Sequence, residues 1–338
     1  MPPIPVRPAP QPAEAIGHAT SVSFGDIDEQ AAALHGWNQR YLQLSRGRFE
    51  GSVKRLQLDG VGLFIEDLHQ SVHQTGWVRD DVFALGVPML IEGDAQFCGQ
   101  TASGRTLHVF SGQQGFEFRS PRRHAMIGIE MDRRLYEAHL EPTANEPGTL
   151  LHQHNAGLMQ PDPAVMARLR NFLLDLFQNL SNPAEGARLA NHMALRRQVR
   201  EQLIDHIAAV LTPQESSAPG CDSRASAAQT ALVERAAECV DNCLGEPPSV
   251  GELCQVLGVS RRTLQSAFHA SWGMSPLVWL TTMRLNAVRR RLKSAANVTD
   301  AATEFGFWHF GHFAGHYQAL FGECPSQTLR RHRRSGEH

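Results

Sequence analysis

Five hydrogen-bonding side chains gather within nine residues in the C-terminal third of this 338-residue chain: Arg261, Arg262, Gln265, Ser266 and His269. The segment is predicted to be a helix, because Val259, Leu264 and Phe268 recur at core spacing and Ser260 can cap its first turn. Arginine and glutamine match the hydrogen-bonding edges of guanine and adenine in the DNA major groove. Each residue alone would be an ordinary solvated side chain, but together on one face they indicate base contact.

A second predicted helix comes directly before this one. Ser249 can cap a helix that runs through Leu257, with Leu253 and Leu257 facing inward, and Gly258 can adopt the positive φ that ends it. A helix, a short glycine-containing turn and a second helix make the geometry that places the second helix in a major groove.

A long helix is predicted next, from Pro276 to Leu292. Its outer side carries basic residues and no acid: Arg284, Arg289, Arg290, Arg291 and, just beyond its end, Lys293. We predict phosphate contacts for the four arginines. The alternative is a solvated basic helix end that interacts with the helix dipole.

The helix-turn-helix pattern then recurs. Thr299 or Asp300 is predicted to open a helix that ends at Phe305, Gly306 provides the turn, and Trp308–Phe321 forms the next helix. His309 lies 49 residues after Ser260, at the matching cap position. Two such units on one connecting helix could enter successive major grooves, roughly 34 Å apart.

The segment from Gly306 to Arg330 resembles the signature of the AraC/XylS family of regulators. Its fixed points are Gly306, Phe307, Phe313, Tyr317, Phe321, Gly322, Pro325 and Ser326. The resemblance covers about Val233–Arg331, and the strings VSRRTLQ, RLNAVRR and GFWH are most similar to the ethanolamine-operon regulator type. It implies a sequence-specific DNA-binding transcription regulator that acts on double-stranded DNA with RNA polymerase, as a homodimer with an effector-sensing domain.

The second unit departs from the family pattern at its base-reading positions. These positions fall on Phe310, Gly311, His312 and Gly315, and neither glycine nor phenylalanine can form bidentate base contacts. We therefore expect the first unit to dominate specificity. Phe310 and His312 are kept as candidates for base contact. Phe310 could pack against a thymine methyl group, and the alternative is that it belongs to the core. His309 is predicted to contact a phosphate.

The region from 21 to 150 is predicted to be rich in β-strands, because short alternating runs are separated by Gly, Asp, Pro or Ser. The runs are Arg55–Leu58, Gly62–Ile65, Gln74–Val78, Val82–Leu85, Leu107–Phe110, Gly115–Arg119 and Ala125–Met131. They favour a small barrel or sandwich, and the family resemblance implies a cupin-like one. With trailing helices and an all-α double helix-turn-helix domain at the C-terminus, the predicted fold class is α+β.

Two helical stripes follow, one around Val165–Leu180 and one around Leu189–Ile207. We expect them to pack on the β-rich domain, although part of the second could form a dimer seam. The predicted organisation is a flexible tail (1–20), a sensor domain (21–150), a helical dimerisation region (151–211), a linker (212–226) and the DNA-binding domain (227–335).

An effector pocket is expected in the β-rich region, where apolar walls would surround a few polar groups. The candidates are Phe64, Glu66, Trp77, Arg79, Phe83 and Phe97, with core aromatics and surface charges as the alternative. Glu66 and Trp77 would suit a small amine such as ethanolamine, because a carboxylate and an aromatic face both attract cations.

Other chemistry is poorly supported. The competing hypothesis is a metal-dependent, cupin-like enzyme with an accessory DNA-binding module. Its metal ligands would be His69 with His73, or His152 with His154, but no acidic residues lie at a clear ligand spacing from them. Cys239 and Cys243 lack a Cys-x-x-Cys knuckle. Phosphate-loop and nucleophile-elbow motifs are absent, as is the Pro-Cys-His-Arg motif of DNA-repair methyltransferases, so we expect no enzyme activity and no cofactor beyond an effector.

Composition and charge agree with a cytoplasmic DNA-binding protein. The N-terminus is proline-rich without an apolar signal segment, and the longest apolar run, Val82–Ile91, is half the length of a membrane span. From Ala225 onward the net charge is +3, whereas the preceding part carries −5. A basic domain beside an acidic one suggests that the C-terminal end meets a polyanion.

Overall fold

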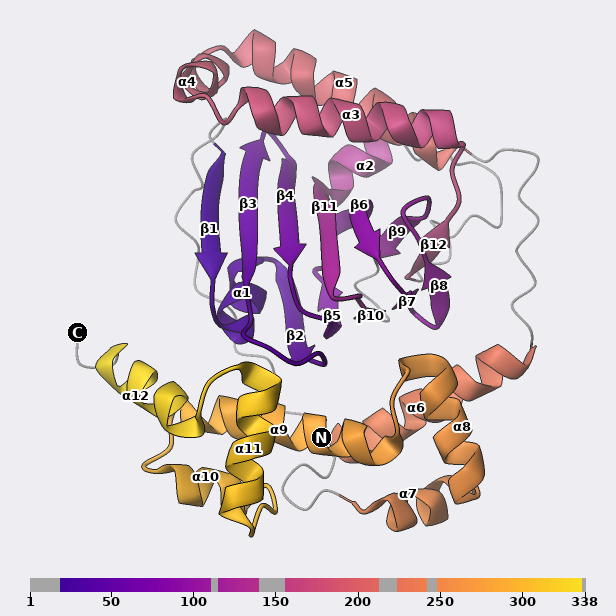
Figure 1. Cartoon of the computed structure of the whole chain (residues 1–338). Coiled ribbons are helices and arrows are strands. Elements are labelled where there is room, and N and C mark those ends of the chain that lie inside the picture. The colour runs from indigo at the N-terminus through magenta and orange to yellow at the C-terminus, as the bar shows by residue number, and fades with distance from the viewer. Residues whose placement is uncertain (1–18, 111–114, 140–155, 213–223, 242–247, 336–338) are drawn as a thin grey trace.

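Two antiparallel β-sheets form the N-terminal part of the computed structural model, which describes residues 19–110, 115–139, 156–212, 224–241 and 248–335 (Figure 1). The seven-stranded sheet comprises, in spatial order, β1 (Thr20–Phe24), β3 (Gly51–Leu58), β4 (Val61–Leu68), β11 (Arg123–Asp132), β6 (Val82–Glu92), β9 (Leu107–Phe110) and β12 (Gly157–Met159). The five-stranded sheet comprises β2 (Trp37–Gln43), β5 (Val72–Val78), β10 (Phe116–Arg119), β7 (Ala95–Phe97) and β8 (Gln100–Ala102). The α+β prediction is confirmed, and each predicted strand lies within an observed one except that Gly115 precedes β10.

Aromatic side chains fill the space between the two sheets. The indole of Trp37 on β2 lies 4.6 Å from the ring of Phe110 on β9 and 5.6 Å from that of Phe64 on β4, centroid to centroid. Phe97 and Phe118 are buried in the same cluster. Because the inward residues of both sheets interdigitate here, the domain is a sandwich with one aromatic core.

Helices cover the other face of the seven-stranded sheet (Figure 1). They are α2 (Arg133–His139), α3 (Pro163–Asn179), α4 (Pro183–Asn191) and α5 (Met193–Leu211), and a short α1 (Ile27–Ala33) follows β1. Leu169 and Leu173 of α3 and Leu203 of α5 are fully buried against β-strand residues such as Leu85. The prediction that both helical stripes pack on the β domain is confirmed.

The C-terminal domain contains seven described helices: α6 (Arg224–Asp241), α7 (Val250–Leu257), α8 (Arg261–Trp272), α9 (Pro276–Leu292), α10 (Val298–Glu304), α11 (Phe310–Phe321) and α12 (Pro325–Ser335). The start of α9 contributes Trp279 to one core with α6, α7 and α8. Its second half contributes Val288 to another core with α10, α11 and α12. One helix therefore links two separate helix-turn-helix cores, as the sequence predicts.

Local capping follows the sequence in the first unit and departs from it in the second. The Ser249 hydroxyl and the Glu252 carboxylate form a capping box at α7, Gly258 ends it at φ 68°, and the Ser260 hydroxyl accepts from Thr263 N at 3.1 Å. The predicted cap at Thr299 or Asp300 is wrong, because Asn297 caps α10 by accepting from Asp300 N. Helix α11 begins at Phe310 rather than at Trp308.

The two domains contact each other along α9 (Figure 1). The amide of Asn286 accepts from Gln43 N at 3.0 Å and donates to Gln43 O at 3.0 Å, so it continues the hydrogen bonding of β2. Gly47 N donates to Leu320 O of α11 at 3.0 Å. Most of the predicted tail (1–20) and most of the predicted linker (212–226) lie outside the described residues. Strand β1 begins at the end of that tail, at Thr20, and α6 begins within that linker, at Arg224.

Candidate nucleic-acid interface

The five candidate base contacts of α8 all lie on its solvent-exposed face: Arg261, Arg262, Gln265, Ser266 and His269. In the part of the chain that the structure describes, none of these side chains has a hydrogen bond or an ion pair. Charged and amide groups that are fully solvated and unpaired remain available for an external partner. The structure thus brings together the predicted set for the first unit.

Core packing fixes the direction of that face. Leu264, Ala267 and Phe268 are buried on the opposite side of α8, and the ring of Phe268 lies 5.1 Å from that of Trp279 on α9. Because the helix is capped at Ser260 and locked against two neighbouring helices, the exposed side chains are presented without further folding.

The second unit presents an apolar and histidine-rich surface. Phe310 is 43% exposed and His309 and His312 are exposed, whereas the positions of Gly311 and Gly315 open onto empty space. The structure does not bury Phe310 as plain core. Trp308, which was predicted to lie inside a helix, precedes α11 and is 70% exposed. Its position two residues after the turn glycine Gly306 could have indicated that it lies in the turn.

Arg284 supports the fold of the second unit instead of facing solvent. Its Nε donates to Phe305 O at 2.7 Å, its Nη2 donates to Gly306 O, and its guanidinium carbon lies 4.3 Å from the centroid of the Phe307 ring. Burial lowers the pKa of this guanidinium. The phosphate contact predicted for Arg284 does not fit this geometry, because the turn carbonyls already occupy its donors.

Arg289 and Arg290 are likewise turned toward the N-terminal domain. Arg289 is only 3% exposed and binds Asp26 and Glu323. Arg290 Nε donates to Asp28 Oδ1 at 3.1 Å. Their predicted phosphate contacts are corrected, because the acidic side chains of the neighbouring domain and of the loop after α11 take the place that phosphate would occupy.

Arg291 is partly exposed and is bound within the C-terminal domain. Its Nε donates to Glu304 Oε2 at 2.7 Å, across to the end of α10. Among the predicted phosphate set, His309 therefore keeps an exposed side chain without a hydrogen bond at the N-terminus of α11. Two exposed arginines of α12 were not predicted from the sequence: Arg330 donates to Ser326 O, and Arg333 donates to Ala296 O.

Comparison with known proteins decides the character of this region. A family model described as a helix-turn-helix domain matches residues 253–331. The XylDLEGF operon transcriptional activator 3 of Pseudomonas putida is 31% identical over 122 residues, which cover 35% of this chain and 34% of the relative. This region is a helix-turn-helix domain.

A second curated relative is similar over a stretch of comparable length. The probable thc operon regulatory protein of Rhodococcus erythropolis is 35% identical over 103 residues, 29% of this chain and 31% of the relative. The chain thus spans about a third of the length of these two relatives. The solved structure of the AraC-like transcriptional activator CuxR aligns over 82% of this chain and 96% of its own, with 15% identity and a TM-score of 0.41.

The predicted effector residues of the sandwich do not share one site. Glu66 is buried and accepts hydrogen bonds from Gln30, Tyr41 and Gln74, and burial raises its pKa. The ring of Phe83 stacks on Tyr136 in the core beneath the helices. These interactions assign Glu66 and Phe83 to the core, which corrects both predictions, because neither side chain reaches a cavity shown by the structure.

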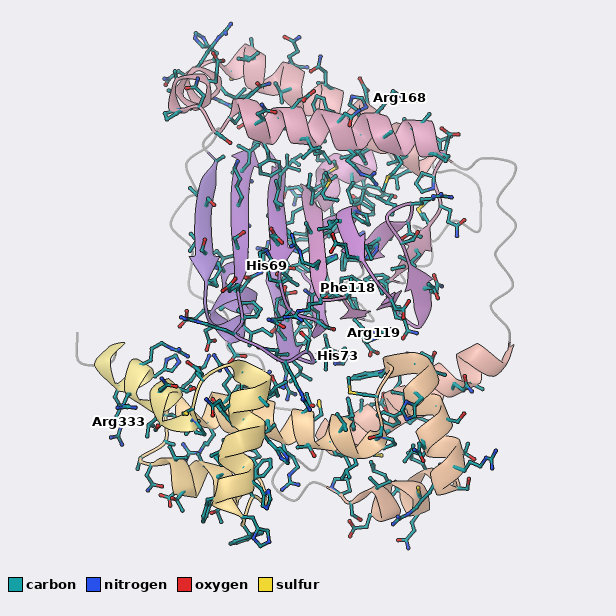
Figure 2. The ribbon with its side chains drawn as sticks, viewed as in Figure 1. His69, His73, Phe118, Arg119, Arg168 and Arg333 are labelled. Carbon is teal, nitrogen blue, oxygen red and sulfur yellow. The ribbon has the colours of Figure 1, made fainter. Side chains whose placement is uncertain are left out.

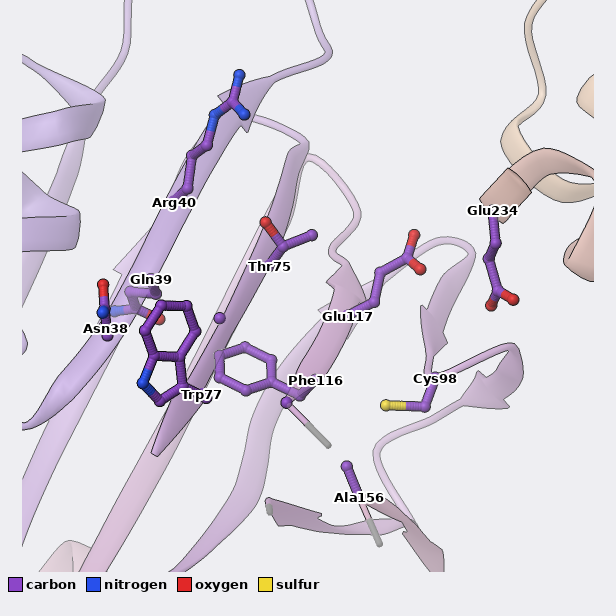
Figure 3. A pocket seen from close by; sticks show the side chains of 12 residues that line it. Asn38, Gln39, Arg40, Thr75, Trp77, Cys98, Phe116, Glu117, Ala156 and Glu234 are labelled. Atoms are coloured by element: carbon purple, nitrogen blue, oxygen red, sulfur yellow. The ribbon is translucent and has the colours of Figure 1, made fainter. Parts of the chain in front are cut away.

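Phe64 and Phe97 are buried in the aromatic core between the sheets, whereas the other two candidates lie at the surface. Arg79 is exposed and pairs with Asp81 in the turn after β5. Trp77 is 46% exposed and lines an open cavity of about 950 Å³ between the five-stranded sheet and α6 of the C-terminal domain (Figure 3). Sequence alone could not predict that cavity, since its two walls come from different domains.

The histidine pairs considered for metal binding receive no support from the described geometry. His69 lies near Glu50 and Asp67 at the surface, whereas His73 binds Glu117, and His152 and His154 are outside the described residues. Within the described ranges no group of three or more His, Cys, Asp or Glu side chains is arranged to hold a metal ion. No described helix is long and apolar enough to cross a membrane.

Proposed function

We propose that this chain is a sequence-specific DNA-binding transcription regulator in which α8 reads base edges in the major groove. The observation that carries the proposal is the exposed, unpaired set of Arg261, Arg262, Gln265 and His269 on a capped and tightly packed helix. Arginine forms bidentate hydrogen bonds with guanine and glutamine with adenine, so this set can distinguish base pairs.

The second unit would contribute register and apolar contacts. Phe310 can contact a thymine methyl group, and His312 and His309 can approach the DNA backbone from the N-terminus of α11. Because α9 joins both units, a site with two contacted grooves roughly one helical turn apart is the expected footprint. The curated relatives that match this domain include a transcriptional activator, which favours activation with RNA polymerase as a partner.

Effector sensing and dimerisation are parts of the same proposal. An N-terminal sandwich joined to a DNA-binding domain through direct contacts, such as Asn286 with Gln43, offers a route from ligand to DNA. Met193, at the start of α5, is 73% exposed and lies on the predicted dimer segment. The ethanolamine-utilisation pathway is the prediction that the VSRRTLQ, RLNAVRR and GFWH strings favour, and virulence or quorum circuits are the alternatives.

The test is binding of the full-length protein to DNA upstream of its own gene, with Arg262→Ala as the variant. Losing one bidentate contact should cost about 1–3 kcal/mol at the specific site and leave non-specific binding intact. Arg168→Ala is the matched control, because Arg168 is exposed on α3, across the sheet from the helix-turn-helix units (Figure 2). Equal, weak binding of all three proteins to any DNA would contradict the proposal.

A further inference from the structure

The outer face of the five-stranded sheet and α6 enclose the cavity of about 950 Å³ shown in Figure 3. Strand register places three outward side chains in one row, because Thr75 pairs with Arg40 on one side and with Glu117 on the other. Glu234 lines the cavity from α6. The cavity therefore has one wall in each domain.

Two carboxylates meet at the end of this cavity. Figure 3 shows Glu117 and Glu234 extending from opposite walls toward the same space. Glu117 Oε1 lies 2.7 Å from His73 Nε2, whereas Glu234 has no hydrogen bond or ion pair with any described residue. Burial raises the pKa of Glu234, and the charges of Glu117 and Glu238 raise it further. A cation bound beside Glu234 would offset the repulsion from these two carboxylates and favour the ionised form of Glu234.

The other charged groups on the sheet wall do not neutralise Glu234. Arg40 lies beyond Thr75, on the far side from Glu117. Arg119 does not line this cavity, but it lines a smaller adjoining one together with Glu117 and Glu234, and its charge helps to lower the pKa of Glu117. The charges that act on Glu234 are those of Glu117 and Glu238, and two carboxylates beside the one guanidinium of Arg119 leave room for a second cationic group.

The lining next to the carboxylates is aromatic and chemically unreactive. Trp77 is 46% exposed and points outward on β5, on the same face of the sheet as Thr75. An exposed indole face attracts ammonium groups. Burial raises the pKa of the nearby Cys98 to about 11, so this residue stays a neutral thiol and supplies no nucleophile. The chemistry of the cavity is therefore that of a binding site.

We propose that this cavity binds an organic cation, with its ammonium group between Glu117 and Glu234 and its carbon skeleton against Trp77. The site stands on its own geometry, and only its effect on DNA rests on the proposed function. Helix α6 shares a core with α8, in which Val233 and Ala236 are buried with Leu264 and Phe268. A ligand that ties the sheet to α6 thereby changes the freedom of the helix that reads DNA.

Titration calorimetry of the full-length protein with phenethylamine and with putrescine tests the site. At least one amine should bind, phenethyl alcohol should not, and Glu234→Gln should weaken binding about tenfold or more, since a hydrogen bond to a charged group contributes about 1.5–3 kcal/mol. Trp77→Ala should also weaken it. Glu185→Gln is the matched control, because Glu185 is exposed on α4 in the layer of helices over the seven-stranded sheet and does not line the cavity.

Absence of binding by both amines, or equal affinities of wild type and Glu234→Gln, would overturn the proposal. Binding to upstream DNA, measured with and without the amine, separates the site from the function. An amine that binds through Glu234 and changes DNA affinity supports both. If an amine binds but the affinity for DNA stays constant, the binding site is supported and its coupling to α8 is contradicted. If the protein binds no DNA specifically, only the proposed function is contradicted.

Discussion

Asp26 and Arg289 form a buried ion pair across the domain boundary, with Oδ2 and Nη2 3.3 Å apart and the side chains 2% and 3% exposed. Burial alone would raise the pKa of Asp26, but Lys293 and Arg289 lower it to about 2. Arg289 also donates to Glu323 Oε1 at 2.8 Å. The basic end of α9 is therefore the docking surface of the C-terminal domain on the N-terminal domain.

Replacing Asp26 with asparagine should reduce the free energy of unfolding by about 3–5 kcal/mol, because Arg289 and Lys293 would lose a buried counter-charge. Chemical denaturation at pH 7 measures the change. Asp81→Asn breaks an exposed pair with Arg79 and should cost less than about 1 kcal/mol. Similar losses in the two variants would show that the buried pair adds nothing to docking.

Arg289→Gln should weaken domain docking and leave the salt dependence of DNA binding unchanged, because Arg289 is buried away from solvent. The measurement is the slope of log affinity against log salt concentration, taken at a temperature where the variant is folded. If Arg289 contacted phosphate, the slope would fall in magnitude by about one. That outcome would restore the phosphate role predicted from sequence.

Two buried histidines should make the N-terminal domain sensitive to mild acid. Burial lowers the pKa of His108 and of His124 to about 3, so both are neutral in the folded state. The unfolded chain binds protons near pH 6.5, and stability therefore falls as the pH drops below 6.5. Each histidine should cost about 2 kcal/mol at pH 5 relative to pH 7.

Denaturation curves at pH 7 and pH 5 check this for wild type and for His124→Phe. Both proteins also share the titration of Asp26, whose lowered pKa affects stability only below about pH 4. The variant should lose roughly half of the acid sensitivity between pH 7 and pH 5. An unchanged difference would mean that His124 is already protonated or solvated in the folded state.

Gly322→Ala should destabilise the protein more than Gly258→Ala. Both glycines have φ near 67°, where alanine costs about 1–2 kcal/mol. A Cβ at Gly322 would lie 2.7 Å from Arg48 N in the N-terminal domain, whereas one at Gly258 would meet nothing within 4 Å. Thermal unfolding of both variants should show an additional loss of about 1–3 kcal/mol for Gly322→Ala, and equal losses would contradict the close domain contact.

The sequence predicts those parts of the fold that are set by local chemistry. Ser249, Gly258 and Ser260 act as the predicted caps, and helix α9 begins at Pro276 and ends at Leu292 as expected. The short strands β7 and β8 and the polar strand β2 were missed, because three residues or a mixed pattern give no clear period.

In the candidate site, too, features set by local sequence were predicted correctly and long-range contacts were not. Residues of α8 were correctly expected to be exposed, because helical periodicity separates them from Leu264 and Phe268. The partners of Arg289 and Arg290 in the N-terminal domain, however, lie more than 200 positions earlier, at Asp26 and Asp28. A local sequence pattern cannot predict a contact between residues so far apart in the sequence. A row of arginines without nearby acidic residues therefore resembles a DNA-binding face even where it is a docking surface between two domains.

The most direct test of the central claim is the base preference of the protein, selected from randomised DNA, for wild type, Arg262→Ala and His312→Ala. Arg262 is exposed on the capped helix α8, and His312 lies beside two glycines on α11. The account predicts that Arg262→Ala relaxes the preference at one or two adjacent base pairs and that His312→Ala leaves it intact. A preference altered by His312→Ala and unaffected by Arg262→Ala would contradict recognition through the first unit.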